Sequence, residues 1–229
     1  MRKAGRLLAS GRDADIFECG EGLVLRRARD GHSMLTEARA MEHVRSFGYP
    51  VPAVDEVSAD GSDLVMERID GPSMVAVLER RPWAVGRQAR VLADLHAQLH
   101  EIRAPDWMQA GPAGGGDAVV HMDLHPLNVI VGASGPVVID WTNAARGEAA
   151  ADVALTWLLL ATAQIPNGGP RAHLLGWFRG VFVRSFLGQV DAEEARRRLA
   201  AVVAWKVADP HMSVSERAAM GKLAVDEGA

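Results

Sequence analysis

Short hydrophobic runs separated by turn residues fill the first 70 residues of the chain. Three of them, at 5–10, 16–19 and 23–28, are divided by glycine-containing turns, and two more flank the turn at 60–62. Runs of this length bounded by turn residues predict short antiparallel strands. The first part of the chain is therefore predicted to form a five-stranded antiparallel sheet.

One segment within this region follows helical spacing instead. Apolar residues recur at intervals of three or four residues from Met34 to Val44, and Ser33 precedes them as a candidate N-cap. This periodicity predicts one helix over 34–46, inserted among the strands.

From residue 71 onward the pattern becomes mainly helical. An apolar stripe at helical spacing runs from Val85 to Ile102 and predicts a helix. Pro82, which precedes the stripe, suits the first turn of this helix. The apolar run 153–165 is interrupted by Thr and Gln and falls short of the about 18–20 residues of a membrane span, so it predicts a buried helix. Asp191 is predicted to open a further helix.

Composition narrows the classes of protein that this pattern can represent. The 229 residues include 25 Lys+Arg and 29 Asp+Glu, a net charge of −4 that excludes a strongly basic binder of polyanions. We therefore expect no nucleic-acid partner, and no membrane partner. The single cysteine, Cys19, excludes an internal disulfide, and the apolar run near the N-terminus is shorter than the about 7–15 residues of a signal-peptide core. These features predict a cytoplasmic protein and leave its oligomeric state open.

Polar residues with metal-binding and acid–base chemistry gather between residues 121 and 140, at the ends of short apolar runs. Asp123 and Asn128 are separated by a short loop containing Pro126, and Asp140 ends the next apolar run. Asn and Asp oxygens are ligands that suit Mg²⁺. A pair formed by Asn128 and Asp140 leaves Asp123 free to orient an attacking hydroxyl group and accept its proton.

A rival interpretation takes His121, Asp123 and His125 as ligands of Zn²⁺ or Fe²⁺, since imidazole and carboxylate groups suit these ions. Pro126 breaks the predicted strand directly after these residues, which disfavours the triad. The remaining histidines are expected to form no second ligand pair; they are His32, His43, His96, His100, His173 and His211.

The segments HMDLHPLNVIV (121–131), PVVIDW (136–141) and GEAAADVA (147–154) resemble three ordered motifs of the aminoglycoside phosphotransferase and choline kinase-like family. The family pattern runs roughly H-G-D-x-H-x-x-N, then I-D-[WF], then G-D-P-x-x-D-L-A. The resemblance implies an α+β, bilobal protein-kinase-like fold. A small antiparallel-sheet lobe with one helix, residues 1–70, would bind the nucleotide, and a mainly helical lobe, residues 71–229, would carry the catalytic and substrate-binding groups.

The resemblance also implies roles for individual residues. Asp123 would be the catalytic base, and Asn128 and Asp140 would hold Mg²⁺. Asp152 would accept hydrogen bonds from the catalytic loop, although its place before an apolar run also fits a helix N-cap. The residues expected to support the loop are His121, His125 and Asp152.

In the first lobe, Arg26 ends a predicted strand where the family carries a lysine that contacts the phosphates of the nucleotide. Glu37 borders the apolar stripe of its helix and is the natural partner of Arg26. The turn at 10–14, with a single glycine, would cover the phosphates, and the backbone after Val65 would bind the base. The other residues expected around the nucleotide are Ser10, Gly11, Met66, Glu67 and Ile69.

These assignments imply a kinase that transfers the γ-phosphoryl group of ATP or GTP, with Mg²⁺, to a hydroxyl group of a small molecule. One alternative is a pseudokinase acting as a binding module, which Arg26 and the glycine-poor turn favour and the retained Asp123 argues against. Another is a protein Ser/Thr kinase, but the short interval between Asp140 and Asp152 leaves little room for a regulatory loop.

The sequence does not identify the acceptor. Four aromatic residues of the helical region could line its pocket, although aromatic residues on helices belong more often to the core: Trp157, Trp177, Phe178 and Trp205.

Overall fold

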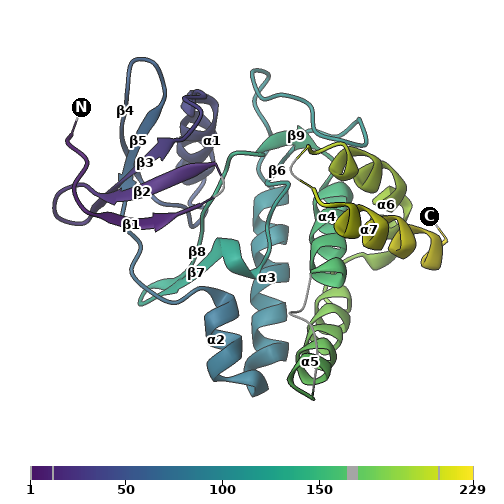
Figure 1. The fold of residues 1–229 in the computed structure, drawn as a ribbon. Coiled ribbons are helices and arrows are strands. Elements are labelled where there is room, and N and C mark those ends of the chain that lie inside the picture. Colours follow the sequence, from purple (N-terminus) through teal and green to yellow (C-terminus); the bar gives the residue numbers. More distant parts are fainter. Residues whose placement is uncertain (1, 12, 164–169, 211, 229) are drawn as a thin grey trace.

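An antiparallel sheet of five strands forms the first part of the computed structural model, which describes residues 2–11, 13–163, 170–210 and 212–228, and the backbone alone for 170–175. The strands lie in the order β1-β2-β3-β5-β4, so that the last strand in sequence is inserted beside β3 (Figure 1). Helix α1 (Leu35–Ser46) connects β3 to β4. The predicted sheet with one inserted helix is confirmed. The strands are β1 (Leu7–Ser10), β2 (Ala14–Glu18), β3 (Leu23–Ala28), β4 (Val54–Val57) and β5 (Asp63–Glu67).

Side chains along β3 point alternately to the two faces of the five-stranded sheet, and this alternation determines on which face Arg26 lies. Leu25 and Val65 pack in a small apolar cluster on one face of the sheet. Leu64 belongs to the main core, which also contains the apolar residues of α1, on the other face. Because neighbouring residues of a strand point to opposite faces, Arg26 lies on the side of α1, where it meets Glu37.

The rest of the chain is mainly helical. Helix α3 packs against α4 and α5, α4 also packs against α5 and α6, and α7 covers α4 and α6 (Figure 1). In the described part of the chain, no helix combines the length and apolar character needed to cross a membrane. The helices are α2 (Met74–Arg80), the 3-10 helix η1 (Pro82–Ala84), α3 (Val85–His100), α4 (Ala149–Thr162), α5 (Pro170–Leu187), α6 (Ala192–Val207) and α7 (Val214–Asp226).

Two small two-stranded sheets lie between the five-stranded sheet and the helices. The first pairs β6 (Ala118–Val120) with β9 (Ala145–Gly147), and the second pairs β7 (Val129–Gly132) with β8 (Gly135–Val138). The loop from β6 to β7, which contains the 3-10 helix η2 (Pro126–Asn128), and the loop from β8 to β9 therefore carry the polar residues singled out in the sequence. Of the apolar run at 119–122, only the first two residues belong to a strand, β6. Strand β9 was not predicted from the sequence.

Several helix ends differ from the prediction. The N-cap of α1 is Met34 rather than Ser33, and it makes no side-chain capping bond. Pro82 opens η1 rather than α3, and α4 begins at Ala149, ahead of the predicted residue 153. Asp191 is an N-cap as expected, since its carboxylate accepts a hydrogen bond from the N–H of Glu194 at 3.0 Å.

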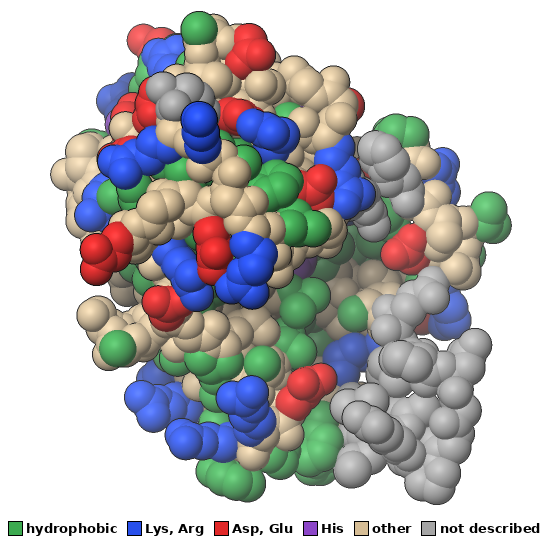
Figure 2. All heavy atoms as spheres, turned by 60° about the vertical axis from the view of Figure 1, so that its left-hand side comes forward, with side chains coloured by type: hydrophobic (Ala, Val, Ile, Leu, Met, Phe, Trp, Pro, Cys, Tyr) green, Lys and Arg blue, Asp and Glu red, His purple; other side chains and the backbone are tan. Residues whose placement is uncertain are grey.

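The surface of the first lobe carries charges of both signs. Figure 2 shows Lys/Arg and Asp/Glu side chains interleaved over the upper part of this face. Ion pairs also join residues at or next to neighbouring strands of this lobe, such as Arg6–Glu18 at 2.6 Å and Arg29–Asp15 at 2.6 Å. This mixture gives the upper part of the face no field of a single sign.

Gly71 lies in the link between the two lobes, where a side chain does not fit. Its φ is +155°, and a Cβ at this position would lie 2.5 Å from the carbonyl oxygen of Val131. We expect Gly71→Ala to lower the free energy of unfolding by about 1–3 kcal/mol, because the backbone must move away from β7. Urea denaturation measures this loss. Gly86→Ala, in an open position of α3, is the matched control and is expected to be neutral or stabilising; equal effects of both changes would contradict this interpretation.

Candidate active site

The loop from β6 to β7 brings Asp123 and Asn128 into direct contact. The side-chain N–H of Asn128 donates to the backbone oxygen of Asp123 at 2.9 Å and to its carboxylate Oδ2 at 3.0 Å. The predicted convergence of these residues is observed. Because the Asn128 nitrogen is directed at Asp123, the amide oxygen is the atom left for another partner.

Asp140 lies beside this pair, two residues after the end of β8. The N–H of Ile139 donates to the carbonyl oxygen of Asn128 at 3.0 Å, which holds the two segments together. The Asp140 side chain is 44% exposed, and its Oδ1 accepts a hydrogen bond from Arg26 at 2.9 Å. Burial alone would raise the pKa of Asp140, but the guanidinium of Arg26 holds it below its ordinary value. Asp140 is therefore ionised at neutral pH.

Arg26 connects the two lobes at this point. It forms a buried ion pair with Glu37, as predicted, and its second nitrogen binds both Asp140 and the hydroxyl group of Thr142, the latter at 2.9 Å. Burial works against the charge of Arg26, but the carboxylates of Glu37 and Asp140 outweigh it and raise the pKa of Arg26. Neither Asp140 nor Thr142 was predicted as a partner of Arg26, because these residues lie more than 100 positions away in the sequence.

Asp152 is fully buried behind the loop and holds its backbone. Its carboxylate accepts hydrogen bonds from the N–H groups of His121 at 3.0 Å and Met122 at 2.8 Å. Met122 has a left-handed φ of +58° and stands where the family pattern has glycine. A non-glycine residue in this conformation costs about 1–3 kcal/mol and requires the surrounding structure to hold it. Asp152 therefore fixes the backbone immediately before Asp123.

The alternative role of Asp152 as a helix N-cap is wrong. The N-cap of α4 is Glu148, and Asp152 lies in the first turn of the helix with its side chain directed at the loop. The ring of His121 does not contact Asp152 either. Its Nε2 lies 3.2 Å from the carbonyl oxygen of Ile139, and the ring packs edge-on against Trp141. His121 binds Asp152 through its backbone.

His125 contributes to the loop through its carbonyl oxygen, which accepts a hydrogen bond from the N–H of Asn128 at 2.8 Å. Its ring nitrogen lies 3.6 Å from Asp123 Oδ1, beyond hydrogen-bond distance. The proposed triad of His121, Asp123 and His125 does not assemble. Among the residues that the structure describes, the group with converging metal-ligand atoms is instead His96, His100 and Asp152.

The expectation that the remaining histidines offer no pair at metal-site spacing does not hold for His96 and His100, whose ring nitrogens converge with Asp152. These residues are four positions apart on α3, a spacing that places two side chains on one helix face. That signal was present in the sequence and was missed. His173 and His211 lie outside the described residues or side chains.

A cavity of about 540 Å³ lies between the five-stranded sheet and the β7–β8 hairpin. The N–H of Glu67 donates to Ala53 at 2.8 Å, so the carbonyl oxygen is the backbone group of Glu67 left to face a ligand. Glu37 does not line the cavity and reaches it only through Arg26. The predicted nucleotide-binding and metal-binding residues that line it are Ser10, Gly11, Arg26, Met66, Glu67, Ile69 and Asp140.

Comparison with known proteins identifies relatives of this arrangement. The sequence model described as the phosphotransferase enzyme family matches residues 4–113 and 106–202. None of the curated proteins that were compared matches the chain.

Several solved structures share the fold. A choline/ethanolamine kinase family protein from Mesorhizobium loti is 14% identical, with a TM-score of 0.60 over 98% of this chain and 87% of that one. A thermostable mutant of aminoglycoside phosphotransferase APH(4)-Ia, in ternary complex with AMP-PNP and hygromycin B, is 14% identical, with a TM-score of 0.68 over 98% and 93%. An amicoumacin kinase in complex with AMP-PNP, Ca²⁺ and its ligand is 13% identical, with a TM-score of 0.53 over 97% and 87%.

These likenesses confirm the expected bilobal protein-kinase-like fold. Since the sequence model covers most of the chain, this protein is an enzyme that belongs to the phosphotransferase enzyme family.

Proposed function

We propose that this enzyme transfers the γ-phosphoryl group of ATP or GTP to a hydroxyl group of a small molecule. The observation that carries the proposal is the hydrogen-bonded pair of Asp123 and Asn128, whose backbone is bonded to the residue before Asp140, a residue that lines the cavity. One carboxylate is thereby available as a base, while an amide oxygen and a second carboxylate remain for a metal ion. The complexes of related folds with AMP-PNP support a nucleotide as co-substrate.

In this proposal, residues 1–70 bind the nucleotide. The base lies against Met66, where the carbonyl oxygen of Glu67 and the N–H of Ile69 face its edge. The turn that contains Ser10 and Gly11 covers the phosphates. Arg26 supplies positive charge in place of the family's lysine, and Glu37 holds the guanidinium in position.

Asn128 and Asp140 fit a magnesium ion, because both offer hard oxygen ligands and Asp140 is ionised. A bound Mg²⁺ neutralises charge that develops on the phosphates. Asp123 has a separate role. Its Oδ2 is held by Asn128, so Oδ1 is the oxygen that takes up the proton of the substrate hydroxyl group. The hydroxyl oxygen bonds to the γ-phosphorus as the bond from this phosphorus to the nucleoside diphosphate breaks.

The small-molecule acceptor is proposed to bind in the helical lobe, residues 71–229, beside the catalytic loop. A second cavity of about 540 Å³ is lined mainly by apolar side chains of α2, α4 and α5, and Pro126 of the loop forms part of its wall. This lining favours an acceptor that carries an apolar portion next to its hydroxyl group. Of the aromatic candidates, Phe178 lines this cavity, whereas Trp157 is buried in the core and Trp177 is exposed.

The metal assignment is tested by nucleotide binding. Magnesium and AMP-PNP, at a nucleotide concentration about 100 times Kd, are expected to stabilise the wild-type protein by about 2.7 kcal/mol. In Asp140→Ala the contribution of magnesium is lost, and phosphoryl transfer is lost with it. Thermal unfolding and release of the nucleoside diphosphate measure the two effects.

Asp70→Ala is the matched control, since Asp70 lines the same cavity but bonds to Arg68 at 2.8 Å. It is expected to keep the response to magnesium. A wild-type protein that binds AMP-PNP equally with and without magnesium would contradict the assignment and favour the pseudokinase alternative.

A further inference from the structure

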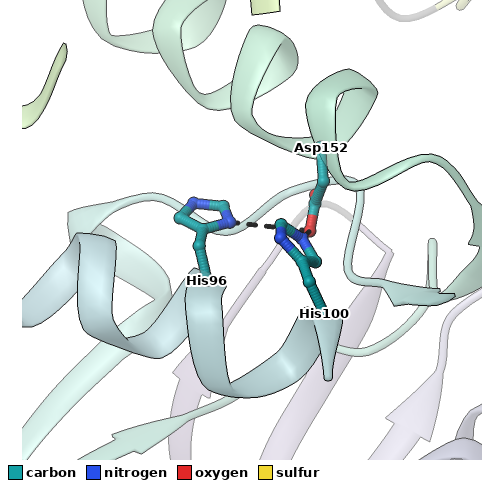
Figure 3. Close-up of side chains that lie close together, drawn as sticks. All are labelled: His96, His100 and Asp152. Carbon is teal, nitrogen blue, oxygen red and sulfur yellow. Dashed lines mark hydrogen bonds and ion pairs between the residues drawn. The ribbon is translucent and has the colours of Figure 1, made fainter. Parts of the chain in front are cut away.

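His96, His100 and Asp152 face one another behind the catalytic loop (Figure 3). The two histidines come from one face of α3, and Asp152 comes from the facing helix α4. The Oδ2 of Asp152 lies 3.0 Å from His100 Nε2 and 3.6 Å from His96 Nδ1. One potential ligand atom from each residue lies within 4.8 Å of the others.

The hydrogen bonds around His96 determine which of its nitrogens carries the proton. The hydroxyl group of Thr156 donates to the carbonyl oxygen of Leu124 at 2.7 Å. A hydroxyl has a single hydrogen, so the contact of 3.1 Å between this oxygen and His96 Nε2 requires the ring to donate. A neutral His96 therefore has its proton on Nε2 and a lone pair on Nδ1.

That lone pair has no hydrogen-bond partner among the described residues, although His96 is 1% exposed. Nδ1 faces a carboxylate oxygen that also accepts rather than donates. Two buried acceptors in this position repel each other unless a cation lies between them. A metal ion held between Nδ1 and the carboxylate oxygen would remove this repulsion and use both lone pairs.

We propose that His96, His100 and Asp152 form a binding site for a divalent transition-metal ion of the Zn²⁺ class, separate from the magnesium site. Ligands about 2.0–2.2 Å from a tetrahedral zinc ion lie about 3.3–3.6 Å from each other; the observed separation of 3.6 Å falls within this range and that of 3.0 Å just below it. Two imidazoles and one carboxylate are a donor set that suits zinc and leaves a fourth position for water.

The surroundings of the cluster match those of a metal site. Thr156 fixes the ring of His96 through its second nitrogen, as a partner beyond the ligands does in metal sites. The His100 side chain is 11% exposed and gives the ion a path of entry. Since Asp152 also binds the backbone before Asp123, the ion ties α3 and α4 to the catalytic loop. The site does not depend on the proposed phosphoryl transfer.

Titration of the chelator-treated protein with Zn²⁺ alone tests this proposal. We expect one zinc ion per chain by isothermal titration calorimetry and a rise in the temperature of unfolding. Co²⁺ in the same site is expected to show the visible absorption bands of a tetrahedral ion. His100→Gln, which keeps a neutral polar side chain at a partly exposed position, is expected to weaken zinc binding by about 100-fold.

His32→Gln is the matched control, because His32 pairs with Asp30 at the surface and lies outside the cluster. It is expected to leave zinc affinity unchanged. The proposal is overturned if the wild-type protein binds no zinc, if Co²⁺ shows no tetrahedral bands, or if His100→Gln binds zinc as the wild-type protein does. Nitrogen NMR of the metal-free protein gives a second readout. An His96 ring protonated on both nitrogens at neutral pH, and unchanged by zinc, would also overturn it.

Discussion

Asp123→Asn is expected to lower the rate of phosphoryl transfer by about 100- to 10,000-fold, the range typical of a lost general base. The amide cannot take up the proton of the acceptor hydroxyl group. Its oxygen can still accept the hydrogen bond from Asn128, and the bond from Asn128 to the backbone of residue 123 is untouched. Nucleotide affinity is therefore expected to stay close to that of the wild-type protein, as measured by titration with AMP-PNP.

Asp117→Asn is the control for this variant. Asp117 lies just before β6, on the chain that leads into the same loop, but its exposed side chain pairs with Arg103 at 3.6 Å. Transfer by Asp117→Asn is expected to match that of the wild-type protein. A rate in Asp123→Asn that is equal to the wild-type rate would remove Asp123 from the reaction.

Asp152→Asn is expected to lower the free energy of unfolding by about 3–5 kcal/mol, which is the typical loss when one partner of a buried charged interaction is removed. The buried carboxylate accepts hydrogen bonds from His100 and from the backbone of His121 and Met122. An amide has one acceptor oxygen, and its NH₂ group would face donors. Urea denaturation at neutral pH measures the loss.

The pH dependence of this loss follows from the pKa of Asp152. Burial alone would raise the pKa, but the hydrogen bond from His100 holds it well below its ordinary value. Its contribution to stability is therefore fully present above the unfolded-state pKa of about 3.9 and is lost as the pH falls toward the lower folded-state pKa. The difference in stability between wild type and Asp152→Asn is expected to shrink below about pH 4.

Asp226→Asn provides the comparison at each pH, because Asp226 lies at the surface of α7 and pairs with Lys222 at 2.5 Å. Its effect on stability is expected to be small throughout. A stability loss in Asp152→Asn that stays constant through the acid range would show that Asp152 is not held as an ionised carboxylate.

Local sequence signals predicted those parts of the fold that local interactions determine. Turn residues and apolar runs located the five strands, and the spacing from Met34 to Val44 located the inserted helix. The convergence of Asp123 and Asn128 was predictable because the residues are five positions apart in a loop that contains Pro126. The motifs between 121 and 154 led correctly to the family and the kinase-like fold.

Contacts between distant parts of the chain were not predictable. Insertion of β5 beside β3, and the pairing of β6 with β9, depend on the packing of the whole molecule. The same holds for the bond between Arg26 and Asp140, which joins the two lobes across 114 positions. Asp152 was placed correctly as a support of the loop, but its position inside α4 depends on where that helix begins.

The cluster of His96, His100 and Asp152 depends on both a local sequence signal and contacts between distant parts of the chain. The spacing of His96 and His100 was visible in the sequence, whereas their partner Asp152 lies more than 50 positions further along the chain. The proton position on His96 follows only from the hydrogen bond between Thr156 and Leu124, which no sequence pattern indicates.

The central claim is that this chain phosphorylates a small hydroxylated molecule with Asp123 as the base. Phosphorus NMR of the wild-type protein and Asp123→Asn, each with Mg-ATP and a panel of hydroxylated acceptors at equal nucleotide occupancy, tests it most directly. The account predicts a phosphomonoester signal from at least one acceptor with the wild-type protein, and loss of that signal with Asp123→Asn. Formation of the same product at the same rate by both proteins would contradict it.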